Sequence, residues 1–180
     1  MEDIKVHAIW LAQDDPKKNT AVLASRRGDL KLHKNLRSIP RKGVILEPLC
    51  GKIFGPEDHE LLTVKHGSLV GLDCSWAQIE SSVETVMKRT RLVPRMLPLL
   101  LAANPVNWGK PSKLTTAEAL AAALYLTGRI EQAKNVLGAF RWRNRFFELN
   151  KEPLDAYRMA KSSSELVDLQ FEFFDIEHLR

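Results

Sequence analysis

The sequence has no apolar run long enough to cross a bilayer. Its longest apolar stretch, Met96 to Ala103, contains Pro98 and is far shorter than the roughly 20 residues of a membrane-spanning helix. The chain opens with Met1-Glu2-Asp3, which is acidic where a signal peptide is basic. We therefore expect a cytoplasmic protein with no membrane partner.

Cysteine is also scarce. The two cysteines, Cys50 and Cys74, stand in different surroundings, and neither has a His or Cys at metal-ligand spacing. This pattern argues against a disulfide scaffold and against a zinc site, so we expect no metal. The sequence also has no Gly-rich phosphate loop and no catalytic Ser-His-Asp order, which removes two common classes of enzyme.

Basic residues, in contrast, are clustered. Nine basic residues and one acid lie between Lys17 and Lys42, in a chain of net charge +5. Clustered Lys and Arg bind nucleic acid because they release counterions from its phosphates, although solvated helix faces have the same composition. The candidate nucleic-acid-binding residues are Lys17, Lys18, Arg26, Arg27, Arg141, Arg143 and Arg145. Trp142 lies among the last three, where it either stacks on a base or packs inside the protein.

Apolar periodicity in the first half alternates between strands and helices. Strands are predicted over Ile4 to Leu11, Val44 to Leu49 and Ser68 to Asp73. Helices are predicted over Thr20 to Ser25, Pro56 to Val64 and Trp76 to Arg89. This alternation favours an α/β fold with a largely parallel sheet.

The second half is mostly helical. After a buried strand over Leu97 to Ala103, helices are predicted over Thr115 to Thr127, Arg129 to Phe140 and Phe146 to Ala160. Thr115 and Glu118 have the spacing of a capping box at the start of the first of these helices. We therefore expect an α/β sheet domain over residues 1–95, an all-helical domain over residues 96–180, and a ligand cleft between them.

Two segments are candidates for that cleft. Asp73 ends a strand, which places its carboxylate at the edge of the sheet where open α/β folds bind ligands, although such an Asp is often a helix N-cap. Trp76 follows in the next turn and suits either the cleft or the core. The segment Asn104–Pro111 combines two prolines with two amides and predicts a rigid loop. It leads to the helix start at Thr115 and Thr116, whose free N–H groups suit a carboxylate.

Five motifs occur in order along most of the chain. They are Asp15-Pro16-Lys17-Lys18-Asn19-Thr20, Leu46-Glu47-Pro48, Leu72-Asp73-Cys74-Ser75-Trp76, Leu97-Pro98 with Ala102 to Pro111, and Thr116-Ala117-Glu118-Ala119-Leu120-Ala121-Ala122-Ala123. Together they resemble the small-subunit ribosomal RNA aminocarboxypropyltransferases of archaea and eukaryotes, which act in ribosome biogenesis. Two positions depart from the family pattern: Trp108 replaces a common Tyr, and Ser112 stands where relatives are often aromatic.

The resemblance implies a SPOUT-like domain with a five-stranded parallel sheet, an all-helical C-terminal domain, a deep trefoil knot and a monomeric enzyme. It implies that S-adenosylmethionine is the cofactor and that its 3-amino-3-carboxypropyl group goes to N3 of a (N1-methyl)pseudouridine in small-subunit rRNA or the pre-ribosomal subunit. Methylthioadenosine would be the by-product. A SPOUT-like rRNA methyltransferase and a non-catalytic ribosome assembly factor stay open as alternatives.

The resemblance also implies roles for individual residues. Asp73 is the candidate base for the imide proton of the target. The expected cofactor contacts are Thr20, Leu46, Pro48, Leu72, Trp76, Ile79, Leu97, Ser112 and Thr116. Of these, Thr20 and Thr116 match the groups that hold the amino-acid carboxylate, and Trp76 with Ile79 would bury the methyl group.

Overall fold

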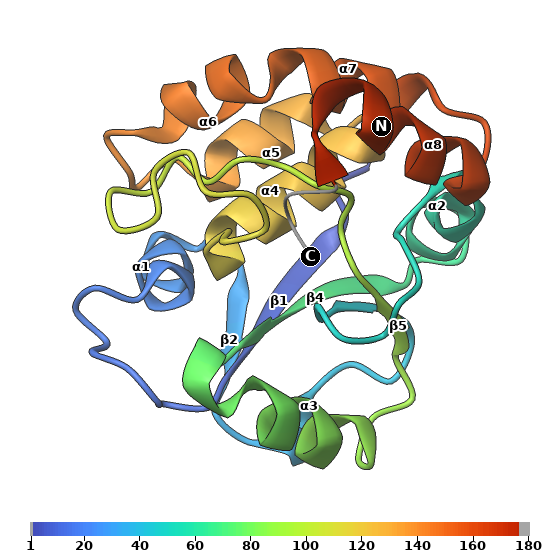
Figure 1. The fold of residues 1–180 in the computed structure, drawn as a ribbon. Helices are drawn as coiled ribbons and strands as arrows, with labels where there is room; N and C mark the ends of the chain where they lie inside the picture. Colours follow the sequence, from blue (N-terminus) through green and yellow to red (C-terminus); the bar gives the residue numbers. More distant parts are fainter. Residues whose placement is uncertain (1, 177–180) are drawn as a thin grey trace.

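A five-stranded sheet with helices on both faces forms the centre of the computed structural model, which describes residues 2–176 (Figure 1). The strands lie in the order β2-β1-β4-β3-β5, and each neighbouring pair is parallel. The predicted five-stranded parallel sheet is thereby confirmed. The strands are β1 Lys5–Trp10, β2 Lys31–His33, β3 Gly43–Leu46, β4 Ser68–Asp73 and β5 Val93–Arg95.

The two edge strands, β2 and β5, were not predicted from the local pattern. Each has only three residues, too few to show an alternation of apolar and polar positions. Pro94 stands in the middle of β5, and proline is tolerated in a sheet mainly at an edge because it lacks an N–H donor. The order of the strands confirms that β5 is such an edge.

The strand predicted over Leu97 to Ala103 is wrong. The segment does not join the sheet, and its one β-bridge connects Leu101 to Pro111 in the following loop. Side chains of the helical half form hydrogen bonds with several of its backbone N–H and C=O groups. Gln170 Oε1 accepts from Leu99 N at 2.8 Å, and Asn150 Oδ1 accepts from Leu101 N at 2.7 Å. Because these side chains provide hydrogen-bond partners for the buried backbone, the segment is stable without pairing to a neighbouring strand.

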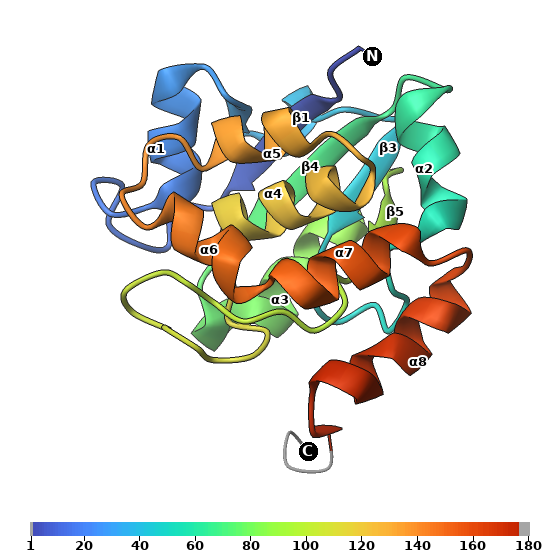
Figure 2. The same ribbon diagram turned by 90° about the horizontal axis from the view of Figure 1, so that it is seen from above.

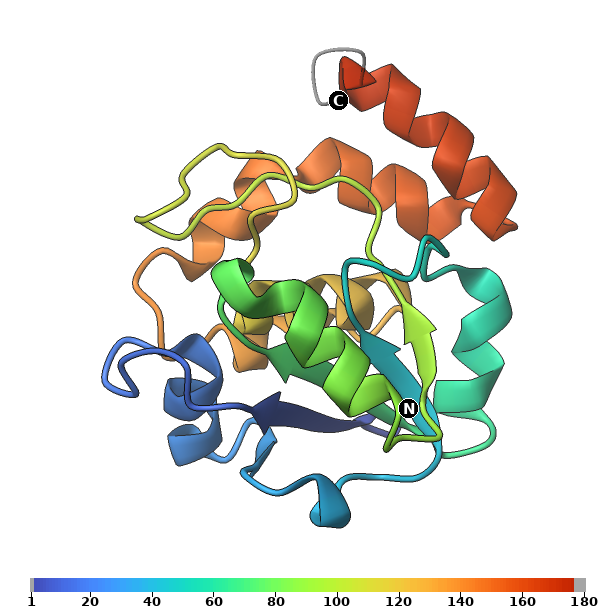
Figure 3. The same ribbon diagram turned by 60° about the horizontal axis from the view of Figure 1, so that its bottom comes forward.

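Each face of the sheet has its own apolar core. Helix α3, Ile79–Met87, covers one face together with the short 3₁₀ turn η1, Leu36–Ser38, and α3 is preceded by a second 3₁₀ turn, η2, Trp76–Gln78 (Figure 3). The predicted helix from Trp76 to Arg89 thus begins with a tighter turn and ends slightly earlier. Four helices pack on or beside the other face, and they are α1 Thr20–Arg27, α2 Pro56–Thr63, α4 Thr116–Leu126 and α5 Ile130–Val136.

Three further helices lie outside this layer, with α7 packed against α4 and both α6 and α8 in contact with α7 (Figure 2). They are α6 Arg143–Leu149, α7 Lys151–Met159 and α8 Ser163–Phe173. The single helix predicted over Phe146 to Ala160 is in fact two helices that meet at Asn150. The buried Asn150 side chain forms hydrogen bonds with the backbone of Leu101 and also donates to Phe146 O at 2.9 Å. Asn150 therefore connects the segment around Leu101 to the point where α6 ends and α7 begins.

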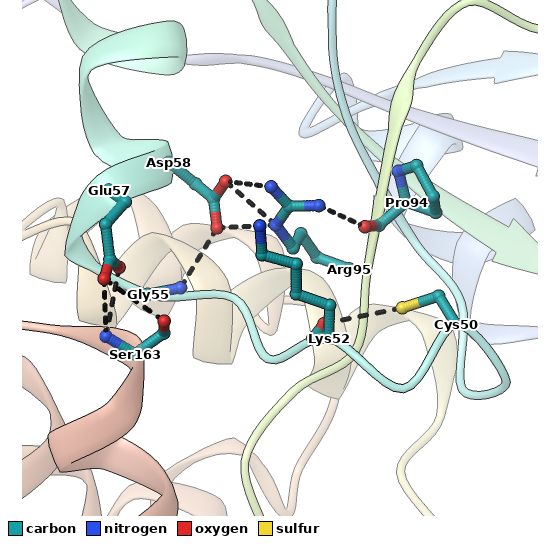
Figure 4. A network of polar contacts seen from close by, with 8 residues as sticks. All are labelled: Cys50, Lys52, Gly55, Glu57, Asp58, Pro94, Arg95 and Ser163. Carbon is teal, nitrogen blue, oxygen red and sulfur yellow. Dashed lines mark hydrogen bonds and ion pairs between the residues drawn. The ribbon is translucent and has the colours of Figure 1, made fainter.

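Polar contacts join α8 to the first half of the chain (Figure 4). The Glu57 carboxylate, in the first turn of α2, accepts from Ser163 N at 2.9 Å, and thus caps the start of α8. Beside it, the Arg95 guanidinium forms a buried ion pair with Asp58 at 2.9 Å. The contacts tie α2, β5 and α8 together. Within residues 2–176, no helix combines the length and hydropathy that a membrane span requires.

Candidate active site

A cleft opens at the carboxyl ends of β3 and β4, beside the first turn of α4. Parallel sheets commonly bind ligands at this edge. The lining combines apolar side chains with a few polar groups, as small-molecule sites do. The residues that line it are Leu46, Glu47, Pro48, Leu72, Cys74, Trp76, Ile79, Met96, Leu97, Pro98, Ser112, Leu114, Thr115, Thr116 and Ala119.

Eight of the nine residues expected to contact the cofactor line this one cleft. The exception is Thr20, which lies at its polar end without lining it: Thr20 Oγ1 accepts from Ala117 N, in the first turn of α4, at 3.3 Å. Glu47 was not predicted as a site residue. Its buried carboxylate accepts from Leu49 N at 2.6 Å and so shapes the turn that ends β3 three residues before the predicted Leu49.

Trp76 stands at the mouth of the cleft, where 44% of its surface is exposed. The turn before it is held by Gln13, whose Oε1 accepts from Ser75 N at 2.8 Å. The Lys113 ammonium lies 4.4 Å from the centre of the Trp76 ring, which shows that a cation is accommodated on this indole face. Trp76 therefore belongs to the cleft and not to the core.

Asp73 is a half-buried junction between three elements. Its carboxylate accepts from Thr116 Oγ1 at 2.6 Å and from Asn19 Nδ2 at 2.5 Å. Burial raises the pKa of Asp73, although the hydrogen bonds from Thr116 and Asn19 act in the opposite direction. Ser75, and not Asp73, is the N-cap residue of η2. Asp73 therefore links the end of β4 to the starts of α1 and α4, one residue before Cys74 in the lining.

Asn19 was missed as a site residue, although its position before a helix start was a visible signal. Its Oδ1 caps α1 by accepting from Val22 N at 2.9 Å. Its Nδ2 donates to Asp73 and to Asp14, the latter at 2.9 Å. One buried amide thus caps a helix and orients the candidate base.

Cys74 lines the cleft but is a poor nucleophile. Burial raises the pKa of its thiol to about 11. The thiol is therefore protonated at neutral pH, whereas the thiolate is the reactive form.

The loop Asn104–Pro111 is anchored by Glu118, on the buried side of α4. The Glu118 carboxylate accepts from Ala103 N at 2.7 Å, Asn104 N at 3.0 Å, Asn104 Nδ2 at 2.9 Å and Thr115 N at 2.7 Å. The last of these contacts completes the predicted capping box, which is confirmed. The three contacts to Ala103 and Asn104 were not predicted, and they give Glu118 a tertiary role beyond the cap.

The helix start approaches the sheet closely at Gly71. A Cβ added to Gly71 would lie 2.8 Å from Thr116 Cγ2 and 3.3 Å from Leu120 Cγ. The missing side chain lets α4 bring Thr116 within reach of Asp73, which ends the same strand.

The candidate nucleic-acid-binding residues are all exposed. Arg143 Nη1 donates to Gly138 O at 3.1 Å, and a Cβ added to Gly138 would lie 2.5 Å from Arg27 Nη2. The structure therefore brings the end of α1 and the start of α6 together. Trp142 is different, because its ring is half-buried and stacks on Phe140 with centroids 4.9 Å apart.

Fold and cleft together define an α/β protein that binds a small ligand between a parallel sheet and a helix start. Comparison with known proteins assigns the family. The family described as "Ribosome biogenesis protein, C-terminal" matches residues 44–174. A 16S rRNA aminocarboxypropyltransferase of Methanosarcina acetivorans is 42% identical over 93% of this chain and 93% of its own length. One of Methanopyrus kandleri is 43% identical, over 88% and 92% of the two chains.

A solved structure gives the same answer. The structure titled "Structure of the SAM-dependent rRNA:acp-transferase Tsr3 from Vulcanisaeta distributa" aligns with a TM-score of 0.82 and 35% identity, over 97% of this chain and 91% of the other. The chain belongs to the 16S rRNA aminocarboxypropyltransferase family, and the resemblance carried by the five motifs is confirmed.

Proposed function

We propose that this protein transfers the 3-amino-3-carboxypropyl group of S-adenosylmethionine to N3 of a (N1-methyl)pseudouridine in small-subunit rRNA. The observation that carries the proposal is the single cleft that collects the sequence-predicted cofactor residues at the edge of the sheet. Family membership supports the reaction, since the relatives are named 16S rRNA aminocarboxypropyltransferases. Methylthioadenosine is the proposed by-product.

The chemistry of the cleft fits this cofactor. Leu46, Pro48 and Trp76 offer the apolar surface that an adenosyl group and its sulfonium need. The backbones of Leu72, Leu97 and Ser112 are the proposed contacts to ribose and adenine. Thr20 and Thr116 are the proposed contacts to the carboxylate.

The position of the two threonines supports their role. Thr116 begins α4, and Thr20, at the start of α1, accepts from Ala117 N in the first turn of α4, where the helix dipole favours a negative group. In the structure the Thr116 hydroxyl donates its only proton to Asp73. Thr116 therefore orients the candidate base through its side chain, and we propose that it holds the carboxylate through the backbone N–H at the start of α4.

The choice of transferred group follows from placement. When bound, S-adenosylmethionine supplies three electrophilic carbons on one sulfur, and the carbon that faces the nucleophile in line reacts. Trp76 and Ile79 both line the cleft and are three residues apart in the chain. We propose that these two side chains enclose the methyl group. The 3-amino-3-carboxypropyl group then faces the RNA. We propose that this positioning of the reacting carbon relative to N3 provides most of the catalysis.

Asp73 is the proposed general base for the N3 proton. Its raised pKa favours proton acceptance near neutral pH over an ordinary Asp. Its two hydrogen-bond donors, Asn19 and Thr116, hold the carboxylate in one orientation. Both contacts fix the position of the group that receives the proton.

We propose that the basic residues near the cleft bind phosphates of the rRNA. The approach of Arg27 and Arg143 to Gly138 supports this role, because it places basic side chains of α1 and α6 on one part of the surface, where clustered cations attract phosphates. We propose the same phosphate-binding role for the other exposed candidates, which are Lys17, Lys18, Arg26, Arg141 and Arg145.

The finer features of the family are proposals of the same kind. We propose a sheet domain over residues 1–95, a helical domain over residues 96–180, a trefoil knot, a monomer and a cytoplasmic location. These features rest on the family resemblance carried by the five motifs.

Labelled cofactor tests the reaction. The protein is incubated with small-subunit RNA and S-adenosylmethionine labelled either in the methyl or in the carboxyl carbon, with Asp73→Asn as a low-activity control. Carboxyl label in the RNA, with methyl label in released methylthioadenosine, is the expected result. Methyl label alone in the RNA would assign a methyltransferase. The absence of saturable cofactor binding by calorimetry would assign a non-catalytic assembly factor.

A further inference from the structure

The tip of the loop Asn104–Pro111 carries apolar side chains that face water. Val106 is 83% exposed and Trp108 is 53% exposed. Figure 1 shows this yellow-green loop projecting from the molecule above α1. A large indole at such a position costs free energy unless it meets a partner, because apolar surface is left in water.

The loop is held firmly in spite of its exposed tip. Gly109 N donates to Ala102 O at 2.7 Å and Ala102 N donates to Lys110 O at 3.1 Å, which closes its base. Glu118 and Asn104 fix the arm before the tip from the buried side. The chain therefore presents Trp108 on a rigid support, so little conformational entropy is lost when a ligand contacts it.

The other three tryptophans have different roles. Trp76 lines the cleft, Trp142 stacks on Phe140, and Trp10 has the Lys34 ammonium 5.3 Å from its ring centre. Trp108 is thus the indole that combines high exposure with a position outside the cleft.

The chain segment around Trp108 is basic and leads into the cleft. No acid occurs between Ala103 and Ala117, whereas Lys110 and Lys113 lie there. Lys113 reaches the Trp76 ring, and Ser112 lines the cleft. A polyanion with flat apolar groups matches this combination of lysines and an exposed indole.

We propose that Trp108 stacks on an unpaired base of the substrate RNA next to the modified nucleotide, while Lys110 and Lys113 contact its phosphates. The inference rests on the proposed function. N3 lies on the pairing edge of the uracil ring, so the target nucleotide reacts only when it is unpaired. When the target base enters the cleft, the base next to it loses a stacking partner, and the indole of Trp108 takes that place and holds the single strand beside the cleft.

A double-mutant-type cycle, with one change in the protein and one in the RNA ligand, tests the stacking contact. The affinities of wild type and Trp108→Ala are measured for a short oligouridine and for an abasic ribose-phosphate oligomer of the same length. Wild type should prefer oligouridine, and Trp108→Ala should lose roughly 5- to 150-fold of its affinity for it, the range for one stacked base. Binding of the abasic oligomer should stay unchanged, because the lysines remain.

Further variants separate stacking from other contacts. Trp108→Tyr should restore most of the preference for oligouridine, whereas Trp108→Leu, which is apolar but not flat, should not. Phe171→Ala removes another exposed aromatic side chain, on α8, and should change neither affinity. Calorimetry with S-adenosylmethionine should give the same affinity for all these variants, which also shows that they are folded.

Three results would overturn the inference. They are equal binding of oligouridine by Trp108→Ala and wild type, full binding by Trp108→Leu, and a wild type that does not distinguish oligouridine from the abasic oligomer. Each leaves the proposed function intact if cofactor binding and transfer to small-subunit RNA persist. A wild type that binds no S-adenosylmethionine would instead remove the proposed function.

Discussion

The two walls of the cleft are built in different ways. We call Leu46, Pro48, Leu72, Trp76 and Ile79 the sheet wall, and Leu97, Ser112, Thr115 and Thr116 the helix wall. The sheet wall follows directly from the ends of β3 and β4, so its position is set by the parallel ladder. The helix wall includes irregular backbone, and buried polar side chains such as Glu118 and Asn104 hold it.

The difference determines what each wall contributes. Apolar contacts of the sheet wall are non-directional and suit the adenosyl and methyl groups. Hydrogen bonds near the helix wall are directional and expensive to leave unmade, which suits the carboxylate and the candidate base. Substitutions in the sheet wall should therefore affect ligand binding, and those behind the helix wall should affect folding.

The largest effect is expected at Asp73, which joins the two walls. Asp73→Asn should lower turnover by roughly 10²- to 10⁴-fold, the usual contribution of a general base. Affinity for the cofactor, measured by calorimetry, should change much less. Asp14→Asn is the matched control, because Asp14 also binds Asn19 but is exposed, and it should keep most of the turnover. Unchanged turnover in Asp73→Asn would end its role as a base.

The same variant should change the pH dependence of stability. Because the pKa of Asp73 is raised in the folded protein, its favourable contribution is fully present below the pKa of the unfolded chain. It is lost as the pH rises through the folded pKa. The free energy of unfolding of wild type, relative to Asp73→Asn, should therefore fall as the pH rises above the ordinary Asp range. A constant difference in urea titrations across this range would contradict the raised pKa.

Glu118→Ala should have the next largest effect, on the helix wall. It leaves four N–H donors without their acceptor, and each buried unpaired donor costs about 1–3 kcal/mol. We expect the free energy of unfolding to fall by on the order of 4 kcal/mol in urea titrations. Glu131→Ala is the control, because Glu131 is exposed on α5, and its loss should change stability little. Equal effects of the two variants would remove the distinction between the walls.

Trp76→Ala should affect the sheet wall alone. Loss of the ring should weaken S-adenosylmethionine binding by roughly 5- to 150-fold, which corresponds to an apolar contribution of about 1–3 kcal/mol. The affinity for RNA and the free energy of unfolding should stay nearly constant, since the ring is 44% exposed. Parallel losses of cofactor and RNA affinity would place Trp76 in the RNA contact instead.

The smallest effect is expected from Glu57, outside both walls. The hydrogen bond from Ser163 N holds the pKa of Glu57 below its ordinary value. Its contribution to stability is therefore present above the pKa of the unfolded chain and lost as the pH falls through the lowered folded pKa. Hydrogen exchange at the start of α8 should accelerate in acid for wild type. Glu57→Gln should show faster exchange already at neutral pH, and identical exchange in both proteins would contradict the cap.

Much of the fold was predictable because its signals are local. The boundaries of β4 agree with the prediction over Ser68 to Asp73, since a buried strand shows in composition alone. The capping box of Thr115 and Glu118 lies within a few residues of chain. The break at Asn150 was not predictable, because the reason for it is a contact with Leu101, 49 residues away.

The candidate site divides in the same way. The sequence by itself determined the parallel sheet, the helix starts and the motifs that assign the family, because each depends on neighbouring residues. Only the tertiary structure decided that Asp73 is held, half-buried, between Asn19 and Thr116, which are 54 and 43 residues distant. It also decided that Trp142 is half-buried against Phe140 while Trp108 faces water. Burial and hydrogen-bond partners are properties of the folded chain, and they set the pKa of a base and the exposure of a ring.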